Sequence, residues 1–170
     1  PDVIIANAEN AASGYGLTKK IANDLFEKEI DVITLGNHSW DQREMLSFIE
    51  ECPKIIRPIN YPAGVPGKGY YELVLEDGRK IIVIQVLLRL FMGILLDDPF
   101  ALIQQKLKSD LLGTSCNAII IDMHGEATSE KTAFGHFVDG KVTGVLGTHT
   151  HIPTSDAKIL DGGTAYQSDV

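Results

Sequence analysis

The chain has 170 residues, of which 44% are hydrophobic and 22% are charged, and its formal net charge is −8 at pH 7. This ordinary globular composition excludes a mainly disordered or low-complexity protein. The acidic balance excludes a protein that coats long nucleic acid, because that role needs a basic surface. The length suits one domain, which we expect to span residues 1–170.

Short apolar runs alternate with helical patterns along the chain, and this alternation predicts an α/β fold. The pair Asp77-Gly78 between two apolar runs predicts a β-hairpin, so part of the sheet is expected to be antiparallel. In chain order we expect a strand over 2–6, a helix over 18–29, a strand over 31–35, a helix over 41–49, hairpin strands over 70–75 and 80–86, a helix over 98–112, a strand over 118–122, a helix over 129–137, and strands over 142–146 and 164–166.

The cysteines and the most apolar segment bear on where the protein works. Cys52 and Cys116 form no C-x-x-C pair, which is typical of reduced thiols in the cytoplasm. The apolar stretch 81–96 contains Gln85 and Arg89 and falls short of the roughly 18 apolar residues that a membrane helix needs. The chain shows no signal-peptide pattern. We therefore expect a cytoplasmic protein without a membrane partner.

Polar residues of the kind that bind metals follow four of the predicted strands. In open α/β sheets, ligand sites form at the carboxyl ends of strands. We therefore expect these side chains to meet at one edge of the fold. They are Glu9-Asn10, Asn37-His38, His124 with Glu126, and His149 with His151.

Two short motifs are the most informative. In His149-Thr150-His151, alternate residues of an extended segment point the same way, so both imidazoles can reach one centre or two adjacent centres. Two surface histidines are a weaker interpretation at a strand end. Gly36-Asn37-His38 is equally compatible with a rigidly held amide ligand and with an ordinary left-handed turn.

Single residues add to this set. Glu9 ends a predicted strand and could be a carboxylate ligand, although glutamate is usually a solvated surface residue. His124 alone would more often be a core histidine. Beside a ligating amide, His38 suits a proton donor or a phosphate contact. We expect Glu126 to cap the following helix, and we expect no catalytic role for His136 in the last turn of that helix.

Together these residues offer one carboxylate, one amide and three imidazoles. Mixed nitrogen and oxygen ligands suit manganese, iron or zinc. The set exceeds the three protein ligands of a typical mononuclear catalytic zinc site, which favours two metals. Two ions about 3.5–4 Å apart clamp the attacking and leaving oxygens in phosphoryl transfer.

At this point the chain resembles a known group. Gly36-Asn37-His38 and the segment 147–151 are similar to motifs of the calcineurin-like metallophosphoesterase superfamily. Flanking segments resemble the bacterial YmdB-like family of 2',3'-cyclic-nucleotide 2'-phosphodiesterases. These segments are residues 7–12, 36–41, 96–100, 127–131 and 162–166. The resemblance implies an α/β/β/α sandwich with mixed sheets that lacks the family's first strand and its C-terminal end.

The resemblance also implies roles for named residues. Glu9 matches a carboxylate that bridges two metals, and His151 matches a ligand of the second metal. The other ligands of the first metal match Asn37, His124 and His149. His38 and Asn10 match residues beside the phosphate, with His38 as the acid or the stabiliser of the transition state. The implied cofactors are two divalent or mixed-valence ions, iron and/or manganese, with zinc or magnesium as alternatives.

The chain departs from the family pattern at several places. The family begins with a strand that ends in Gly-Asp-Val, whose Asp completes the second metal, whereas no residue precedes Pro1 here. Leu88 stands where the family usually has Gly, and Gly125 replaces a common Ala. We therefore expect the single domain to be incomplete at both ends.

The leading hypothesis is an enzyme, a metallophosphoesterase that hydrolyses 2',3'-cyclic nucleotides with a hydroxide activated by two metals. One alternative keeps the site but changes the substrate, to phosphomonoesters or phosphoprotein. The other alternative is a non-catalytic metal-binding or regulatory module. The expected partner is a small phosphodiester without long nucleic acid, and the resemblance suggests a homo-oligomer.

Overall fold

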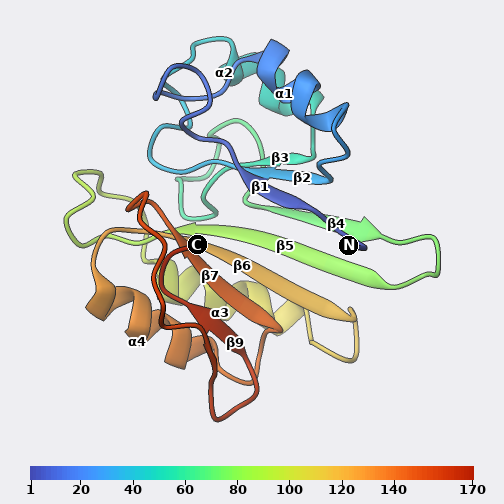
Figure 1. Cartoon of the computed structure of the whole chain (residues 1–170), viewed down its shortest axis with the longest axis vertical. Coiled ribbons are helices and arrows are strands. Elements are labelled where there is room, and N and C mark those ends of the chain that lie inside the picture. Colours follow the sequence, from blue (N-terminus) through green and yellow to red (C-terminus); the bar gives the residue numbers. More distant parts are fainter.

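The computed structural model describes all 170 residues and arranges them in four layers (Figure 1). Helices α1 and α2 cover a three-stranded sheet, and helices α3 and α4 cover a six-stranded sheet on the opposite side. This arrangement confirms the predicted α/β/β/α sandwich. The elements are β1 Ile5–Asn7, α1 Lys19–Phe26, β2 Val32–Thr34, α2 Met45–Glu51, β3 Ile55–Ile56, β4 Tyr70–Val74, β5 Lys80–Leu87, α3 Pro99–Ser109, β6 Ala118–His124, α4 Thr128–Val138, β7 Gly144–Thr148, β8 Lys158–Ile159 and β9 Ala165–Gln167.

The two sheets differ in strand direction. The smaller sheet has the order β1-β2-β3 and is parallel throughout. The larger sheet has the order β4-β5-β6-β7-β9-β8, and its four inner strands are parallel while both edge strands are antiparallel. The Asp77-Gly78 turn joins β4 to β5 as predicted, with Gly78 at φ 85°. Parallel pairing places the carboxyl ends of the inner strands at one edge of each sheet.

Several element boundaries differ from the sequence prediction. Helix α2 begins at Met45, not at Asp41, because the carboxylate of Asp41 binds Nδ1 of His38 at 2.6 Å and residues 41–44 form turns. Helix α3 ends at Ser109, three residues early, where Asp110 turns extended at φ −112°. The strands β3 and β8 were not predicted, because a two-residue strand carries no readable periodicity.

Two apolar cores hold the layers together. The larger core has 16 buried residues and lies between the six-stranded sheet and helices α3 and α4. The second core has 9 buried residues and lies between the smaller sheet and helices α1 and α2. A third cluster, Val32, Ile56 and Val83, packs between the sheets. Burying each such side chain contributes about 1.5–3 kcal/mol, so the apolar faces of both sheets drive their layering.

Side-chain amide groups join the two sheets near their carboxyl ends. The side chain of Gln85 on β5 is fully buried, accepts from the backbone N–H of Leu35 at 2.9 Å and donates to the carbonyl of Leu35. Asn7 on β1 donates to the same carbonyl at 2.8 Å and to Asp122 on β6 at 3.1 Å. These bonds fix the segment after β2 against the ends of β5 and β6.

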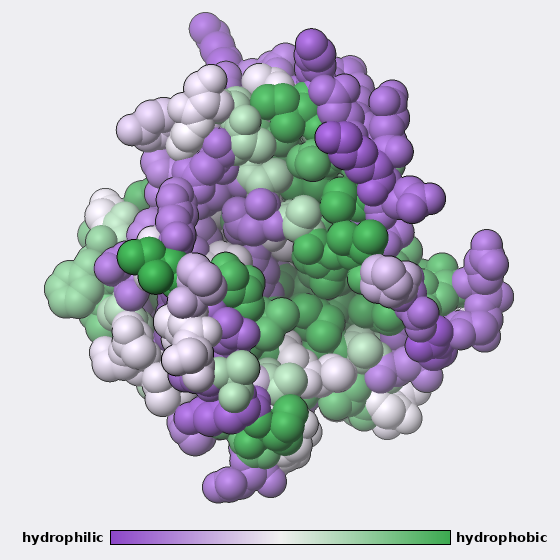
Figure 2. All heavy atoms as spheres, in the orientation of Figure 1, coloured by the Kyte–Doolittle hydropathy of each residue, from purple (hydrophilic) through white to green (hydrophobic).

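A partly apolar cleft lies between the sheets, where Figure 2 shows hydrophobic surface in the hollow beside β1 and β5. Its volume is about 280 Å³, and its lining includes Ile5, Val83 and Ile120 at the apolar end and Asp122 and Thr148 at the polar end. No helix in the structure is both long and apolar enough to span a bilayer.

Candidate metal centre

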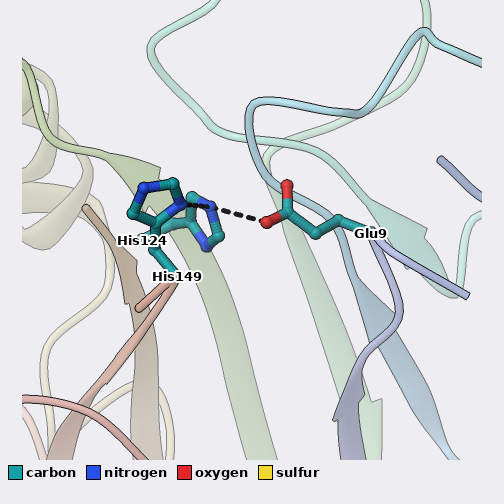
Figure 3. Close-up of side chains that lie close together, drawn as sticks. All are labelled: Glu9, His124 and His149. Atoms are coloured by element: carbon teal, nitrogen blue, oxygen red, sulfur yellow. Dashed lines mark hydrogen bonds and ion pairs between the residues drawn. The ribbon is translucent and has the colours of Figure 1, made fainter. Parts of the chain in front are cut away.

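Four of the five predicted metal ligands come together where the carboxyl ends of the two sheets meet. Glu9 follows β1 and Asn37 follows β2, both in the smaller sheet. His124 ends β6 and His149 follows β7, both in the larger sheet. Figure 3 shows the carboxylate of Glu9 pointing across the gap toward the two imidazoles. The site therefore needs both sheets.

The polar atoms of these four residues converge on one nitrogen. Nε2 of His124 lies 2.9 Å from Oε1 of Glu9, 2.9 Å from Oδ1 of Asn37 and 3.2 Å from Nδ1 of His149. One ring nitrogen carries at most one proton, so it cannot satisfy three acceptors at once. A cation among these atoms would satisfy all of them, and the donor set therefore fits a metal ion.

A buried hydrogen-bond relay orients His124. Thr148 donates its hydroxyl proton to Oδ1 of Asp122 at 2.6 Å, so the hydroxyl oxygen accepts from Nδ1–H of His124 at 2.8 Å. Because Nδ1 then carries the proton, Nε2 of a neutral His124 presents its lone pair to the other three residues. Such outer partners commonly fix the tautomer and direction of a metal-binding histidine.

Electrostatics favour the protonation states that metal ligands need. Without a metal, burial alone would raise the pKa of Glu9, but a protonated His124 at hydrogen-bond distance and the backbone N–H of His38 outweigh it and lower that pKa. Burial and the neighbouring charge of His124 lower the pKa of His149. An ionised carboxylate and a neutral imidazole are the forms that bind metals.

The backbone at the site is closely packed at Gly36 and adopts rare conformations at His149 and His151. A Cβ on Gly36 would press against the carboxylate of Glu9 and lie 2.6 Å from Nε2 of His124, so this position has no room for a side chain. His149 has φ 114° and His151 has φ 61°, in the left-handed region that few non-glycine residues adopt. Strained conformations of this kind cluster at functional sites.

The other predicted site residues lie at the rim. His151 is exposed, and its Nε2 lies 3.1 Å from Oδ1 of Asn10, outside the Glu9, His124 and His149 group. His38 donates its backbone N–H to Oε2 of Glu9 at 3.1 Å, while its ring contacts Asp41 through Nδ1. The structure thus places Asn10, His38 and His151 around the centre.

The prediction that Glu126 caps a helix is wrong. Ala127 occupies the N-cap position of α4, and Oε2 of Glu126 lies 3.3 Å from Nε2 of His149. Nε2 of His149 thus faces this carboxylate, while the other ring nitrogen, Nδ1, lies in the centre. His136 is exposed in the last turn of α4, as predicted.

Sequence reasoning missed the residues that support the ligands. Asp122 and Thr148 orient His124, and Asp41 pairs with His38. One signal could have revealed the first of these, because Asp122 interrupts an otherwise apolar buried strand. A charged residue in such a place is rarely buried without partners. Thr148 and Asp41 carry no comparable signal.

Comparisons with known proteins identify the family of the chain. A family model described as "YmdB-like protein" matches residues 1–170. The chain is 46% identical to a 2',3'-cyclic-nucleotide 2'-phosphodiesterase from Bacillus subtilis, covering 100% of this chain and 63% of that protein. The chain therefore spans less than two thirds of the length of this curated relative.

Two solved structures have the same fold. A hypothetical protein from Thermus thermophilus superposes with a TM-score of 0.92 at 44% identity, covering 100% of this chain and 65% of that one. A protein from Mycoplasma pneumoniae described as a novel phosphatase superposes with a TM-score of 0.89 at 33% identity, covering 99% of this chain and 60% of that one.

Proposed function

This chain belongs to the YmdB-like protein family, and from that premise we propose that it is a metal-dependent phosphodiesterase that hydrolyses 2',3'-cyclic nucleotides. One observation carries the proposal, namely the convergence of Glu9, Asn37 and His149 on Nε2 of His124. The name of the Bacillus subtilis relative supports the substrate class.

The proposed metal ligands are divided between two ions. Glu9 would bridge them, and His151 would bind the second ion. The first ion would be held by Glu9 with Asn37, His124 and His149. The mixed donors favour iron and/or manganese, with zinc or magnesium as alternatives. When bound, such ions supply a hydroxide at neutral pH and neutralise charge on the phosphate.

His38 is the proposed acid. Asp41 engages its Nδ1 at 2.6 Å, which orients the ring and leaves Nε2 free of protein hydrogen bonds. In opening a 2',3'-cyclic phosphate, water adds to phosphorus, the bond from phosphorus to the ribose 2'-oxygen breaks, and His38 delivers a proton to that oxygen. The product is a nucleoside 3'-phosphate. We place Asn10 beside the phosphate, where its amide is held by contacts with Gly14 and His151.

The test compares substrates and metals in one set of assays. The protein stripped with a chelator should be inactive on 2',3'-cyclic AMP, and manganese or iron should restore hydrolysis to the 3'-phosphate. Faster hydrolysis of p-nitrophenyl phosphate or a phosphopeptide would favour the phosphomonoesterase or phosphoprotein phosphatase alternative, which the description of the Mycoplasma pneumoniae structure supports. Metal binding without turnover of any substrate would favour a metal-binding or regulatory module.

We also propose a cellular location, a partner and an oligomeric state for the protein. Cys52 and Cys116 are both free, which supports the cytoplasm as its location. The proposed partner is a small phosphodiester. The resemblance in sequence is the basis for proposing a homo-oligomer, which light scattering of the purified protein would test.

A further inference from the structure

A buried ion pair lies directly behind the loop that carries His149. Lys131 on α4 and Asp169 after β9 are each only 2% exposed, and Nζ of Lys131 lies 2.6 Å from Oδ2 of Asp169. Neither residue belongs to the proposed ligand set. Removing two charges from water costs free energy that offsets their mutual attraction, so such a pair is weak evidence for a purely stabilising role.

The remaining side-chain hydrogen bonds of this pair go to the ligand loop. Nζ of Lys131 donates to the backbone carbonyl of Thr148 at 2.9 Å. Oδ2 of Asp169 accepts the backbone N–H of Thr150 at 3.1 Å. The pair therefore holds the peptide groups on both sides of His149. Lys131 does so from α4, and Asp169 does so from the segment after β9.

The residue between these two peptide groups, His149, has an unusual backbone conformation. His149 adopts φ 114°, which an L-residue rarely does unless its surroundings enforce it. In this conformation Nδ1 of His149 lies 3.2 Å from Nε2 of His124. A relaxed backbone at this position would turn the imidazole away from the other ligands.

We propose that the Lys131–Asp169 pair is a positioning device that clamps the loop 148–150 and so presents His149 to the metal. The inference rests on the proposed metal centre. Lys131 does not act on substrate itself, because it is buried and its ammonium group is already bound by Asp169 and Thr148.

The decisive variant removes the clamp without leaving a buried charge. Lys131→Met combined with Asp169→Asn keeps side chains of similar size and leaves neither charge unpaired. Its affinity for Mn²⁺, titrated by the electron paramagnetic resonance signal of the free ion, should fall by about 10–100-fold, the usual effect of losing an outer partner of a metal ligand.

A matched control separates positioning from general stability. Asp139 also holds a loop through its carboxylate, accepting backbone N–H groups of Gly162 at 2.7 Å and Thr164 at 3.2 Å, but it contacts none of the ligands. Asp139→Asn should lower the melting temperature and leave Mn²⁺ affinity at the wild-type value. A merely structural role for the clamp would make the two variants alike.

The outcomes are distinct. Wild-type affinity in the double variant would overturn the clamp, and so would an equal loss of affinity in Asp139→Asn. Should the double variant fail to fold, Lys131→Gln combined with Asp169→Asn replaces it, because this pair also leaves no buried charge. A several-fold loss of Mn²⁺ affinity in that variant would support the clamp, and unchanged affinity would overturn it. A wild-type protein that binds none of manganese, iron, zinc and magnesium would instead refute the metal centre on which the inference rests.

Discussion

The proposed chemistry depends on which nitrogen of each imidazole faces the centre. In His124 the Thr148 hydroxyl occupies Nδ1, and in His149 the Glu126 carboxylate lies beside Nε2. The two rings therefore direct opposite nitrogens toward each other, 3.2 Å apart. In His38 the Asp41 carboxylate takes Nδ1, so all three rings are oriented by a neighbour outside the proposed ligand set.

His38 offers the most direct test of the proposed mechanism. His38→Ala removes the proposed acid, so turnover of a 2',3'-cyclic nucleotide should fall by about 10²–10⁴-fold. The metal content should stay near normal, because His38 contributes only its backbone N–H to Glu9. Steady-state kinetics and metal analysis check both expectations. His136→Ala, at an exposed position of α4, is the control, and unchanged turnover in His38→Ala would exclude the acid role.

Gly36 should be intolerant of any side chain. An alanine Cβ there would push against the Glu9 carboxylate and Nε2 of His124, so Gly36→Ala should lose most of its metal affinity. Gly144→Ala is a matched control in β7, because a Cβ at Gly144 meets nothing closer than 3.5 Å. Mn²⁺ titration of both proteins gives the comparison, and equal affinities would contradict the steric argument.

At the level of elements, the ends of strands carry the site, and the turns that follow them set its geometry. The segment after β6 shows how closely these turns are packed. Leu88 is buried, and its backbone N–H donates to the carbonyl of His124 at 2.8 Å. A Cβ on Gly125 would lie only 2.7 Å from Cβ of Leu88. Two of the departures from the family pattern, Leu88 and Gly125, are therefore in contact, and we expect them to compensate for each other.

This contact predicts energetic coupling. Gly125→Ala should destabilise the protein by about 1–3 kcal/mol, as overpacking does. Combining it with Leu88→Gly removes the clash, so the double variant should be more stable than the sum of its parts by about 0.5–3 kcal/mol. Urea unfolding of the four proteins in the cycle measures this. Leu88→Ala keeps the Cβ and should show a smaller coupling with Gly125→Ala. Full additivity in the first cycle would disprove compensation.

At the level of the whole molecule, the centre joins two separately packed halves. Glu9 and Asn37 follow strands of the smaller sheet, which has its own core, whereas His124 ends and His149 follows a strand of the larger sheet. Direct links between them include the third apolar cluster and the side-chain amides of Gln85 and Asn7. An ion bound to ligands from both sheets would act as a cross-link.

Metal should therefore stabilise the fold as well as support catalysis. At a Mn²⁺ concentration about 100 times its Kd, the free energy of unfolding should rise by about 2.7 kcal/mol. That corresponds to a melting temperature higher by roughly 5–10 °C for a chain of this size. Excess chelator should reverse the shift, and Glu9→Gln should reduce it, as thermal unfolding would show. A shift of equal size in Glu9→Gln would indicate binding elsewhere.

The sequence by itself determined the alternation of strands and helices, the hairpin at Asp77-Gly78 and the polar residues at four strand ends. These features follow from local rules, since periodicity, capping and turn chemistry act over a few residues. It also identified Asn37 and His124, 87 positions apart, as candidates for one site.

Only the tertiary structure decided how those candidates meet. It separated His151 from the convergent group and gave Glu126 a histidine partner in place of a helix cap. It also paired Lys131 with Asp169, 38 positions apart, behind the ligand loop. The physical reason is that ring orientation and burial of charge depend on the packing of one layer against another, which no local pattern in the chain encodes.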